Sequence, residues 1–381
     1  MLNLIIRKAF LSMISSIEYK KIEIAMKKPF VIAIGSTDVY EGYIVRVKTK
    51  DGYEGIGEAV PTPHIMGDSM GSVENELNIF SKKLIGLDIS PERTNEKMIS
   101  LARDSKSSRA AVDMAIWDII GKKANLPIHS ILGNYRPDAE TSYTVDLVEP
   151  EIAANQAVEL LNEGVTVFKI KLGSGIEKDY SRVEKVRKTI GDDKQLYVDF
   201  NQSYTAKKAI ALSEKISRFN IEFLEQPVPA DDVKALRFVK DHTTIPVMAD
   251  EAVKSPQDAV RVIQNEAADM INLKLMKSGG ITDGIAIIKT CQSFRIPVMI
   301  GCMVETRLAN TAGLHIGLSY PAVKYTDLDG FSSLKEDIVT GGLVFKNGKN
   351  YLQDGGDAQG GITKVTSISS KVSSLYFSDP K

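Results

Sequence analysis

The sequence predicts an α/β fold, in which a closed barrel of alternating strands and helices follows a smaller α+β domain. From about residue 139, eight short apolar segments with strand character alternate with helical patterns. Polar side chains near the ends of five successive segments recur at steps of 28, 26, 25 and 24 residues, namely Lys171, Asp199, Glu225, Asp250 and Lys274. Such a step fits one strand, one helix and their loops, which is the repeat of a βα barrel. Before residue 135 the pattern differs, because antiparallel strand signals precede a run of helices.

Length and composition limit the class of protein. The chain has 381 residues, 43% of them hydrophobic, which suffices for two or three domains with a large core. Its net charge of −1, with 25% charged residues, argues against a nucleic-acid or membrane-surface partner. Only two cysteines are present, so we expect no disulfide framework and a cytoplasmic protein. Arg7 and Lys8 interrupt the apolar opening, which argues against a signal peptide or a membrane span.

The first predicted domain covers residues 13–135, after an extension of residues 1–12 that ends before a second possible start at Met13. Its opening residues alternate in polarity like a strand, and EGYIVRVKTKDGYEGIGEAV reads as two strands joined at Asp51-Gly52, a dipeptide typical of hairpin turns. The intervening segment VIAIGSTDVY is predicted as a loop. Helical patterns then run to about residue 125, and the last of them begins at a serine and ends near Gly121.

The second predicted domain covers residues 136–330 and holds the barrel. Its eight strands are predicted in TSYTVDL, VTVFKIKL, QLYVDFN, IEFLEQPV, PVMADEAV, MINLKLMK, PVMIGCMV and VKYTDLDG. An open doubly wound sheet is the alternative, but that fold calls for a glycine-rich phosphate loop after its first strand, and the sequence has none there. Residues 331–381 are rich in Gly and Ser and too short for a third domain, so we expect them to pack back on the first domain.

The strand FKIKLG carries two lysines, Lys169 and Lys171, which alternation places side by side on one face. The side chains at the carboxyl ends of barrel strands converge on one mouth, so Asp199, Glu225 and Asp250 are expected to meet there. Three converging carboxylates repel one another unless a cation lies among them. Because only oxygen ligands are available, the expected ion is Mg²⁺, with Mn²⁺ as a possible substitute.

Lys171 and Lys274 come from strands on either side of these carboxylates, which suggests two bases facing one substrate. Removal of a hydrogen α to a carboxylate gives an enediolate, and a metal ion together with an ammonium group stabilises its charge. A lysine acts as a base only with a lowered pKa, which Lys169 and a metal ion would provide for Lys171. Taken singly, each lysine reads as a rim charge and each acid as a helix cap, but five such groups in register favour a site.

These residues resemble the enolase superfamily, and within it the muconate-lactonising-enzyme subgroup. The KIK of residues 169–171, the ladder of three acids and Lys274 in NLKLMKSGG match that subgroup's pattern, and the likeness extends from about Met13 over nearly the whole chain. The resemblance implies a (β/α)₇β barrel, and it makes the first domain a capping domain whose loops close the barrel mouth and select the substrate.

The segment TDLDG resembles the Asp-x-Asp motif by which dipeptide epimerases of this family hold the ammonium group of a dipeptide. By this resemblance Asp327 and Asp329 bind that group, and the acid/base pair is Lys171 and Lys274. Three other substrate contacts are implied: Lys169 and Thr144 at the substrate carboxylate, and the segment GCMVETRL, with Cys302 and Met303, along the side-chain pocket.

The resemblance implies L-Ala-D/L-Glu as the first candidate substrate, and murein-peptide recycling as the setting. Family members acting on this dipeptide can carry an arginine in the first capping loop, where this chain has Gly35, so Arg307 or an unplaced lysine would have to replace it. An apolar second residue stays open for this reason.

Other functions of the same subgroup are the alternatives: an N-acylamino acid racemase, an o-succinylbenzoate synthase or a cycloisomerase. A protein that binds carboxylates without catalysis is a more remote one. The sequence leaves the oligomeric state open, including a homo-oligomer.

Overall fold

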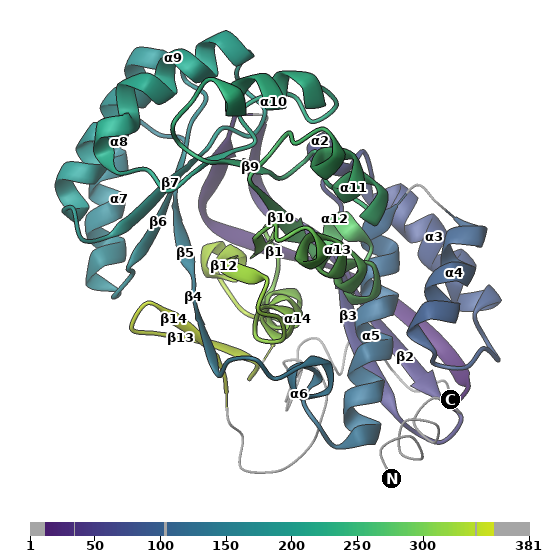
Figure 1. The fold of residues 1–381 in the computed structure, drawn as a ribbon. Helices are drawn as coiled ribbons and strands as arrows, with labels where there is room; N and C mark the ends of the chain where they lie inside the picture. Colours follow the sequence, from purple (N-terminus) through teal and green to yellow (C-terminus); the bar gives the residue numbers. More distant parts are fainter. Residues whose placement is uncertain (1–11, 34, 103–104, 340, 354–381) are drawn as a thin grey trace.

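The computed structural model describes residues 12–33, 35–102, 105–339 and 341–353. The predicted fold class is confirmed, because eight parallel strands form one sheet in chain order and a separate antiparallel sheet precedes them. A parallel bridge between Thr141 and Thr326 joins the two ends of the eight-stranded sheet and closes it into a barrel. Figure 1 shows the barrel strands surrounded by helices, with the N-terminal domain beside them.

The barrel strands coincide with the eight predicted segments. They are β5 (Ser142–Val145), β6 (Val167–Lys171), β7 (Gln195–Asp199), β8 (Leu224–Glu225), β9 (Val247–Ala249), β10 (Met270–Lys274), β11 (Val298–Gly301) and β12 (Val323–Asp327). Lys171 pairs in register with Asp199, and Asp199 with Glu225, so these three candidate groups end their strands at one level. This register follows from parallel pairing, in which the carboxyl ends of all strands share one edge.

The helices between the strands are amphipathic and bury one face against the barrel. They are α7 (Pro150–Asn162), α8 (Ile176–Ile190), α9 (Ala206–Ile216), α10 (Val233–Asp241), α11 (Pro256–Gln264), α13 (Ile281–Ser293) and α14 (Arg307–Gly317). Two short turns interrupt the alternation, η1 (Ser217–Phe219) after α9 and α12 (Leu275–Ser278) after β10. Helix α9, for example, buries Ala209, Leu212 and Ile216, whose spacing repeats every three to four residues. Helical patterns in the sequence predict most of these helices.

The capping domain consists of a three-stranded antiparallel sheet and helices packed on it. Its elements are β1 (Ile14–Ile32), β2 (Gly35–Thr49), β3 (Glu54–Ala59), α2 (Pro63–Met66), α3 (Met70–Lys83), α4 (Pro91–Leu101), α5 (Lys106–Ala124) and α6 (Ile128–Leu132). The predicted turn at Asp51-Gly52 is confirmed, with Gly52 in the left-handed region at φ 87°. Helix α5 lies so close to β3 that a Cβ on Gly55 or Gly57 would come within 2.0 Å of a carbonyl oxygen of α5.

The prediction of a loop at residues 31–40 is wrong. Strands β1 and β2 continue through this segment, with Phe30 opposite Thr37 and Ile32 opposite Gly35, so that it forms the tip of a long hairpin. A register shift between Ala25 and Phe30 explains the error, because the bulge breaks the polar–apolar alternation that indicates a strand. We call the described residues 30–33 and 35–37 the hairpin tip.

The described part of the C-terminal segment contacts both domains. Leu334, after η2 (Gly330–Ser333), bridges Met26 of β1. The hairpin of β13 (Leu343–Lys346) and β14 (Lys349–Leu352) instead pairs with β4 (Asp138–Glu140), the strand that leads into the barrel. The predicted domain boundaries stay predictions, and residues 1–11 and 354–381 lie outside the described residues.

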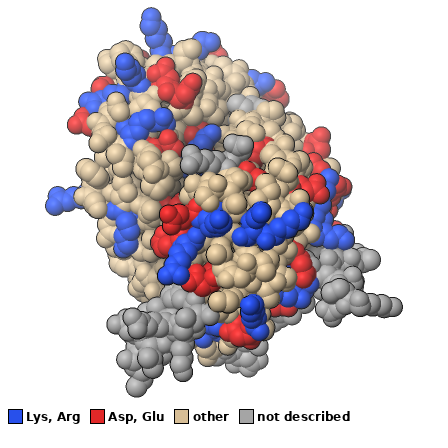
Figure 2. All heavy atoms as spheres, turned by 90° about the vertical axis from the view of Figure 1, so that its right-hand side faces the viewer, with Lys and Arg blue, Asp and Glu red and all other residues tan. Residues whose placement is uncertain are grey.

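Basic and acidic side chains alternate over the face of the molecule seen in Figure 2, without a large area of one sign. This distribution matches the net charge of −1. Among the residues that the structure describes, no helix combines the length and the apolar character needed to cross a membrane.

Candidate active site

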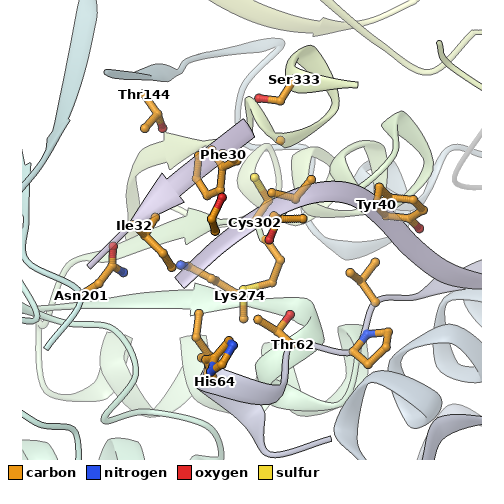
Figure 3. A pocket seen from close by; sticks show the side chains of 18 of the residues that line it. Phe30, Ile32, Tyr40, Thr62, His64, Thr144, Asn201, Lys274, Cys302 and Ser333 are labelled. Atoms are coloured by element: carbon orange, nitrogen blue, oxygen red, sulfur yellow. The ribbon is translucent and has the colours of Figure 1, made fainter. Parts of the chain in front are cut away.

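A cavity of about 370 Å³ lies between the barrel mouth and the capping domain. The barrel contributes the predicted site residues Thr144, Lys169, Lys171, Lys274, Cys302, Met303, Asp327 and Asp329 to its lining. The capping domain contributes the hairpin tip and the segment around α2. Figure 3 shows Phe30, Ile32 and His64 of the capping domain around Lys274 and Cys302 of the barrel. The cavity therefore brings together the two domains that the sequence predicted to form one site.

Lys169 and Lys171 lie side by side, as alternation along β6 predicts, and both are buried. The Nζ of Lys171 is 2.7 Å from Oδ2 of Asp199. The Nζ of Lys169 lies 2.7 Å from Oδ2 of Asp327, 3.2 Å from Oδ2 of Asp199 and 3.4 Å from Oε2 of Glu225. Lys169 is thus shared by three carboxylates from three strands, whereas Lys171 has one.

Lys274 lies on another strand and pairs with another acid. Its Nζ is 2.8 Å from Oδ2 of Asp250, and the opposite oxygen of Asp250 accepts a hydrogen bond from Lys277. Burial alone would lower the pKa of Lys274, but Asp250 outweighs it and holds that pKa above its usual value. A base needs a shift in the other direction, so in this arrangement Lys274 is an ammonium group.

Glu225 lies between the two other acids and is buried. Its Oε1 accepts a hydrogen bond from the Asn272 side chain at 2.6 Å, while its Oε2 has no hydrogen-bond partner. Burial, and then the neighbouring charge of Asp199, raise the pKa of Glu225 to about 8. The carboxylates therefore repel one another, as expected for acids that share one site.

Asp199, Glu225 and Asp250 provide a set of donor atoms that fits a hard divalent cation. All are carboxylate oxygens at adjacent strand ends, and Oε2 of Glu225 is a buried acceptor without a hydrogen-bond donor. In the part of the chain described, however, no three acidic, imidazole or thiol side chains are grouped closely enough to ligate one ion as they stand. Lysine ammonium groups contact all three acids, Asp199 at 2.7 Å, Asp250 at 2.8 Å and Glu225 at 3.4 Å, so an ion would have to displace these contacts.

The two acids of the TDLDG segment both contact β5, but they differ in environment. Asp327 is buried and accepts a hydrogen bond from the Ser142 hydroxyl at 2.8 Å, besides its ion pair with Lys169. Asp329 is half-buried, and its Oδ2 accepts the backbone N–H of Thr144 at 2.8 Å. Burial, and then Asp327, raise the pKa of Asp329 to about 6. Asp329 is therefore the more available of the two for a substrate cation.

The predicted pocket residues Cys302 and Met303 lie in the loop after β11 and face the same cavity. The Sγ of Cys302 is 4.0 Å from Oδ1 of Asp329, and burial raises the pKa of its thiol. Thr144 lines the cavity from β5. Arg307, the candidate cation for a substrate carboxylate, pairs instead with Asp337 at 2.6 Å and does not line the cavity.

Sequence reasoning missed several residues that hold these groups in place. Asn272 precedes Lys274 by two residues on β10, so alternation along the strand could have placed it at the site. Lys277, which bonds Asp250, lies in a helical turn where no pattern pointed to the site. The capping-domain residues that line the cavity, such as Phe30 and Ile32, were not predicted, because the sequence indicates a loop at residues 31–40.

Comparison with known proteins gives the same family for both domains. Residues 16–133 match the mandelate racemase / muconate lactonizing enzyme N-terminal domain, and residues 153–356 match the enolase C-terminal domain-like family.

Curated relatives cover most of the chain. A hydrophobic dipeptide epimerase of Enterococcus faecalis is 34% identical over 92% of this chain and 99% of its own length. An L-Ala-D/L-Glu epimerase of Bacillus subtilis is 36% identical over 86% of this chain and 91% of its own. An N-succinyl-L-Arg/Lys racemase of Bacillus cereus is 32% identical over 85% of this chain and 89% of its own length.

A solved structure agrees with them. The dipeptide epimerase of Cytophaga hutchinsonii, complexed with Mg and the dipeptide D-Ala-L-Val, superposes with a TM-score of 0.89 at 31% identity, covering 92% of this chain and 95% of that one. These relatives are epimerases and racemases, which confirms the predicted enzyme class, an isomerase.

Proposed function

The chain belongs to the mandelate racemase / muconate lactonizing enzyme family of the enolase superfamily, and we propose that it is a metal-dependent dipeptide epimerase. The observation that carries this proposal is the pairing of two buried lysines with two different acids in one cavity. Lys171 pairs with Asp199, and Lys274 with Asp250. Asp329 lies in the same lining, where it can receive an ammonium group.

Each side chain then has one task. Lys171 and Lys274 remove and return the α-proton of the second residue from opposite sides, which inverts its configuration. Lys169 contacts the substrate carboxylate and offsets the negative charge that develops on it. Asp327 keeps Lys169 in place through their 2.7 Å ion pair, and Asp329 receives the substrate's ammonium group.

Asp199, Glu225 and Asp250 would hold the metal ion, for which Mg²⁺ is proposed. A bound divalent ion supplies positive charge next to the substrate carboxylate and acidifies the α-hydrogen. Asp250 bound to such an ion would no longer hold the pKa of Lys274 above its usual value, so this lysine could lose its proton. Binding of the metal ion would therefore be a condition for Lys274 to act as a base.

For the second residue of the dipeptide, two candidates remain. L-Ala-D/L-Glu is the first expectation, and it agrees with the name of one relative. The lining of the cavity favours an apolar residue, because Phe30, Ile32 and Ile65 face it from the capping domain. Among the lining residues that the structure describes, the lysines are the three assigned above and none is an arginine, while Asp38 would repel a glutamate side chain.

A panel of dipeptides in D₂O tests the proposed function. The purified enzyme is incubated with Mg²⁺ and with Ala-Glu, Ala-Leu, Ala-Phe and Ala-Lys. Proton NMR then follows deuterium uptake and configuration at the second α-carbon. We expect uptake with inversion, faster for Ala-Leu and Ala-Phe than for Ala-Glu. Absence of exchange on every dipeptide, in the presence of Mg²⁺ or Mn²⁺, overturns the proposal.

The second candidate function is an N-acylamino acid racemase, which the relative from Bacillus cereus favours. Such a substrate has no α-ammonium group, because its α-nitrogen is acylated, so its binding does not need Asp329. Replacing Asp329 by Asn should lower kcat/KM for dipeptides about 100-fold, the loss of a buried charge pair, and leave acylated amino acids unaffected. Exchange on N-succinyl amino acids alone would favour the racemase.

A further inference from the structure

A buried carboxylate joins the capping domain to the barrel without touching the cavity. Glu58 of β3 is fully buried, is absent from the cavity lining and has no task in the proposed chemistry. It accepts four hydrogen bonds: from the Tyr40 hydroxyl at 2.6 Å, from the N–H and hydroxyl of Thr306 at 2.8 and 2.5 Å, and from the N–H of Ala309 at 3.1 Å. One donor belongs to the capping domain and three belong to the barrel.

These bonds fix the start of α14 and the loop that precedes it. Thr306 is the residue before the first turn of α14, so Glu58 satisfies backbone N–H groups that would otherwise have no partner. Within the loop, the N–H of Met303 donates to the Glu305 carboxylate at 2.9 Å. Residues 302–306 are therefore fixed at both ends: β11 ends directly before residue 302, and Glu58 bonds Thr306 at the other end.

The same loop packs tightly against the end of β12. A Cβ on Gly330 would lie 2.3 Å from the carbonyl oxygen of Met303 and 3.1 Å from Sγ of Cys302. Gly330 directly follows Asp329, whose Oδ1 is 4.0 Å from the same sulfur. A displacement of the loop therefore moves the acid proposed to bind the substrate's ammonium group, together with the Cys302 and Met303 wall beside it.

We propose that Glu58 is a positioning residue that sets selectivity for the first residue of the dipeptide. This inference rests on the proposed function. Glu58 acts through Thr306 on residues 302–304 and through them on Asp329, which are the groups around the substrate's amino end. In the proposed function the α-carbon of the second residue lies between Lys171 and Lys274, and these lysines pair with Asp199 and Asp250, which take no part in this chain of contacts.

Two conservative variants test the proposal. Glu58→Gln keeps the size of the side chain but turns an NH₂ group toward hydrogen-bond donors. Thr306→Val replaces with a methyl group the hydroxyl that donates to Glu58 and also accepts the N–H of Leu308, so the inference requires the same change of selectivity in both variants. Thr306→Ser keeps that hydroxyl and should restore wild-type behaviour. Glu54→Gln is the matched control, because Glu54 lies on the same strand, is exposed and pairs only with Lys48 and Arg46.

The measurement is kcat and KM for Ala-Leu, Leu-Leu and Ala-Phe. For Glu58→Gln and Thr306→Val we expect KM to rise about tenfold while kcat stays within about twofold, since a binding contact and not proton transfer is disturbed. The ratio of kcat/KM for Ala-Leu to kcat/KM for Leu-Leu should move about fivefold closer to one. The corresponding ratio for Ala-Leu and Ala-Phe should stay unchanged, because these two dipeptides share their first residue. Circular dichroism and thermal melting establish that the variants are folded.

Three outcomes overturn the inference. They are unchanged selectivity in both variants, an equal loss with all three dipeptides, and a loss confined to kcat. Glu58→Ala is not required, so a variant that fails to fold does not decide the test. Failure of the proposed function is recognised separately, because it leaves the wild-type enzyme without activity on any dipeptide, and it removes the inference as well.

Discussion

Lys171 and Lys274 have the same residue type and the same burial, but they differ in what surrounds them. Lys171 pairs with Asp199 and lies beside Lys169, which three acids share. Lys274 pairs with Asp250, which also pairs with Lys277. Each lysine thus meets a different carboxylate at its own strand end. Removal of one lysine should leave the other in place and still ion-paired, so the two can be tested independently.

We predict that Lys171→Ala and Lys274→Ala each lower kcat for epimerisation by a factor of about 10² to 10⁴, which is the usual contribution of a general acid or base. Each variant should keep deuterium exchange on one antipode of the second residue only, and the two variants should keep opposite antipodes. Proton NMR in D₂O on both diastereomers of Ala-Leu measures this. Lys207→Ala, an exposed lysine on α9, is the control. Exchange on both antipodes by either variant would contradict the two-base assignment.

At this scale the sequence predicted which residues meet, but not how they are paired. The near-constant spacing placed five side chains near strand ends; strand register puts Lys171, Asp199 and Glu225 at one level, while Asp250 directly follows β9 and Lys274 ends β10. The contact between Lys169 and Asp327 joins β6 to β12, 158 residues apart, and depends on barrel closure. Periodicity along one strand carries no information about such a contact, so neither this ion pair nor the raised pKa of Lys274 could be predicted.

Among the elements, the β1–β2 hairpin has the greatest effect on the cavity, since its tip reaches across the barrel mouth. Ala33 at the tip packs on the loop after β6, where a Cβ on Gly173 would come within 2.7 Å of the Ala33 side chain. That loop directly follows Lys171 and is held by Asp179, which accepts the N–H groups of Gly173 and Ser174. A loop prediction for the tip therefore missed a structured contact between the domains.

We predict that Gly173→Ala loosens the hairpin tip and raises KM about tenfold, with a smaller effect on kcat. Gly173 has φ 141°, where a side chain is strained, and the new methyl group would collide with Ala33. Gly175→Ala is a matched control, because Gly175 has φ 101° in the same loop but no atom within 4 Å of an added Cβ. Both variants should lose about 1–3 kcal/mol of stability from backbone strain. An equal rise of KM in both would mean that strain, and not contact with the tip, is responsible.

For the molecule as a whole, the two domains are joined by helix α5 of the capping domain and the amino end of α13 in the barrel. The Asp113 carboxylate accepts the N–H groups of Ile281 and Thr282 and the hydroxyl of Thr282. Gly280 leaves room for it, since a Cβ there would lie 2.4 Å from Oδ2 of Asp113. The sequence predicted both elements from their periodicity, but their contact spans 168 residues and follows only from packing.

The stability of this junction should depend on pH through Asp113. Burial raises its pKa from 3.8 to about 7, against the opposing effect of its three donors. Between about pH 4 and pH 7 the folded protein therefore keeps a proton that the unfolded chain has lost. Its contribution to the free energy of unfolding is then largest at low pH and falls by about 1.4 kcal/mol per pH unit in this window, with no further change above about pH 7.

Asp113→Asn isolates this contribution. An amide resembles the protonated acid, because its oxygen accepts the two N–H groups while its NH₂ donates to the Thr282 hydroxyl. We predict that the variant and the wild type unfold at similar urea concentrations near pH 4.5, and that the variant becomes the more stable of the two as pH rises to 7.5. Other titrating groups affect both proteins equally, so the difference between the two curves reports Asp113 alone. A difference that stays constant from pH 4.5 to 7.5 would show that Asp113 is ionised throughout, held as an anion at the amino end of α13.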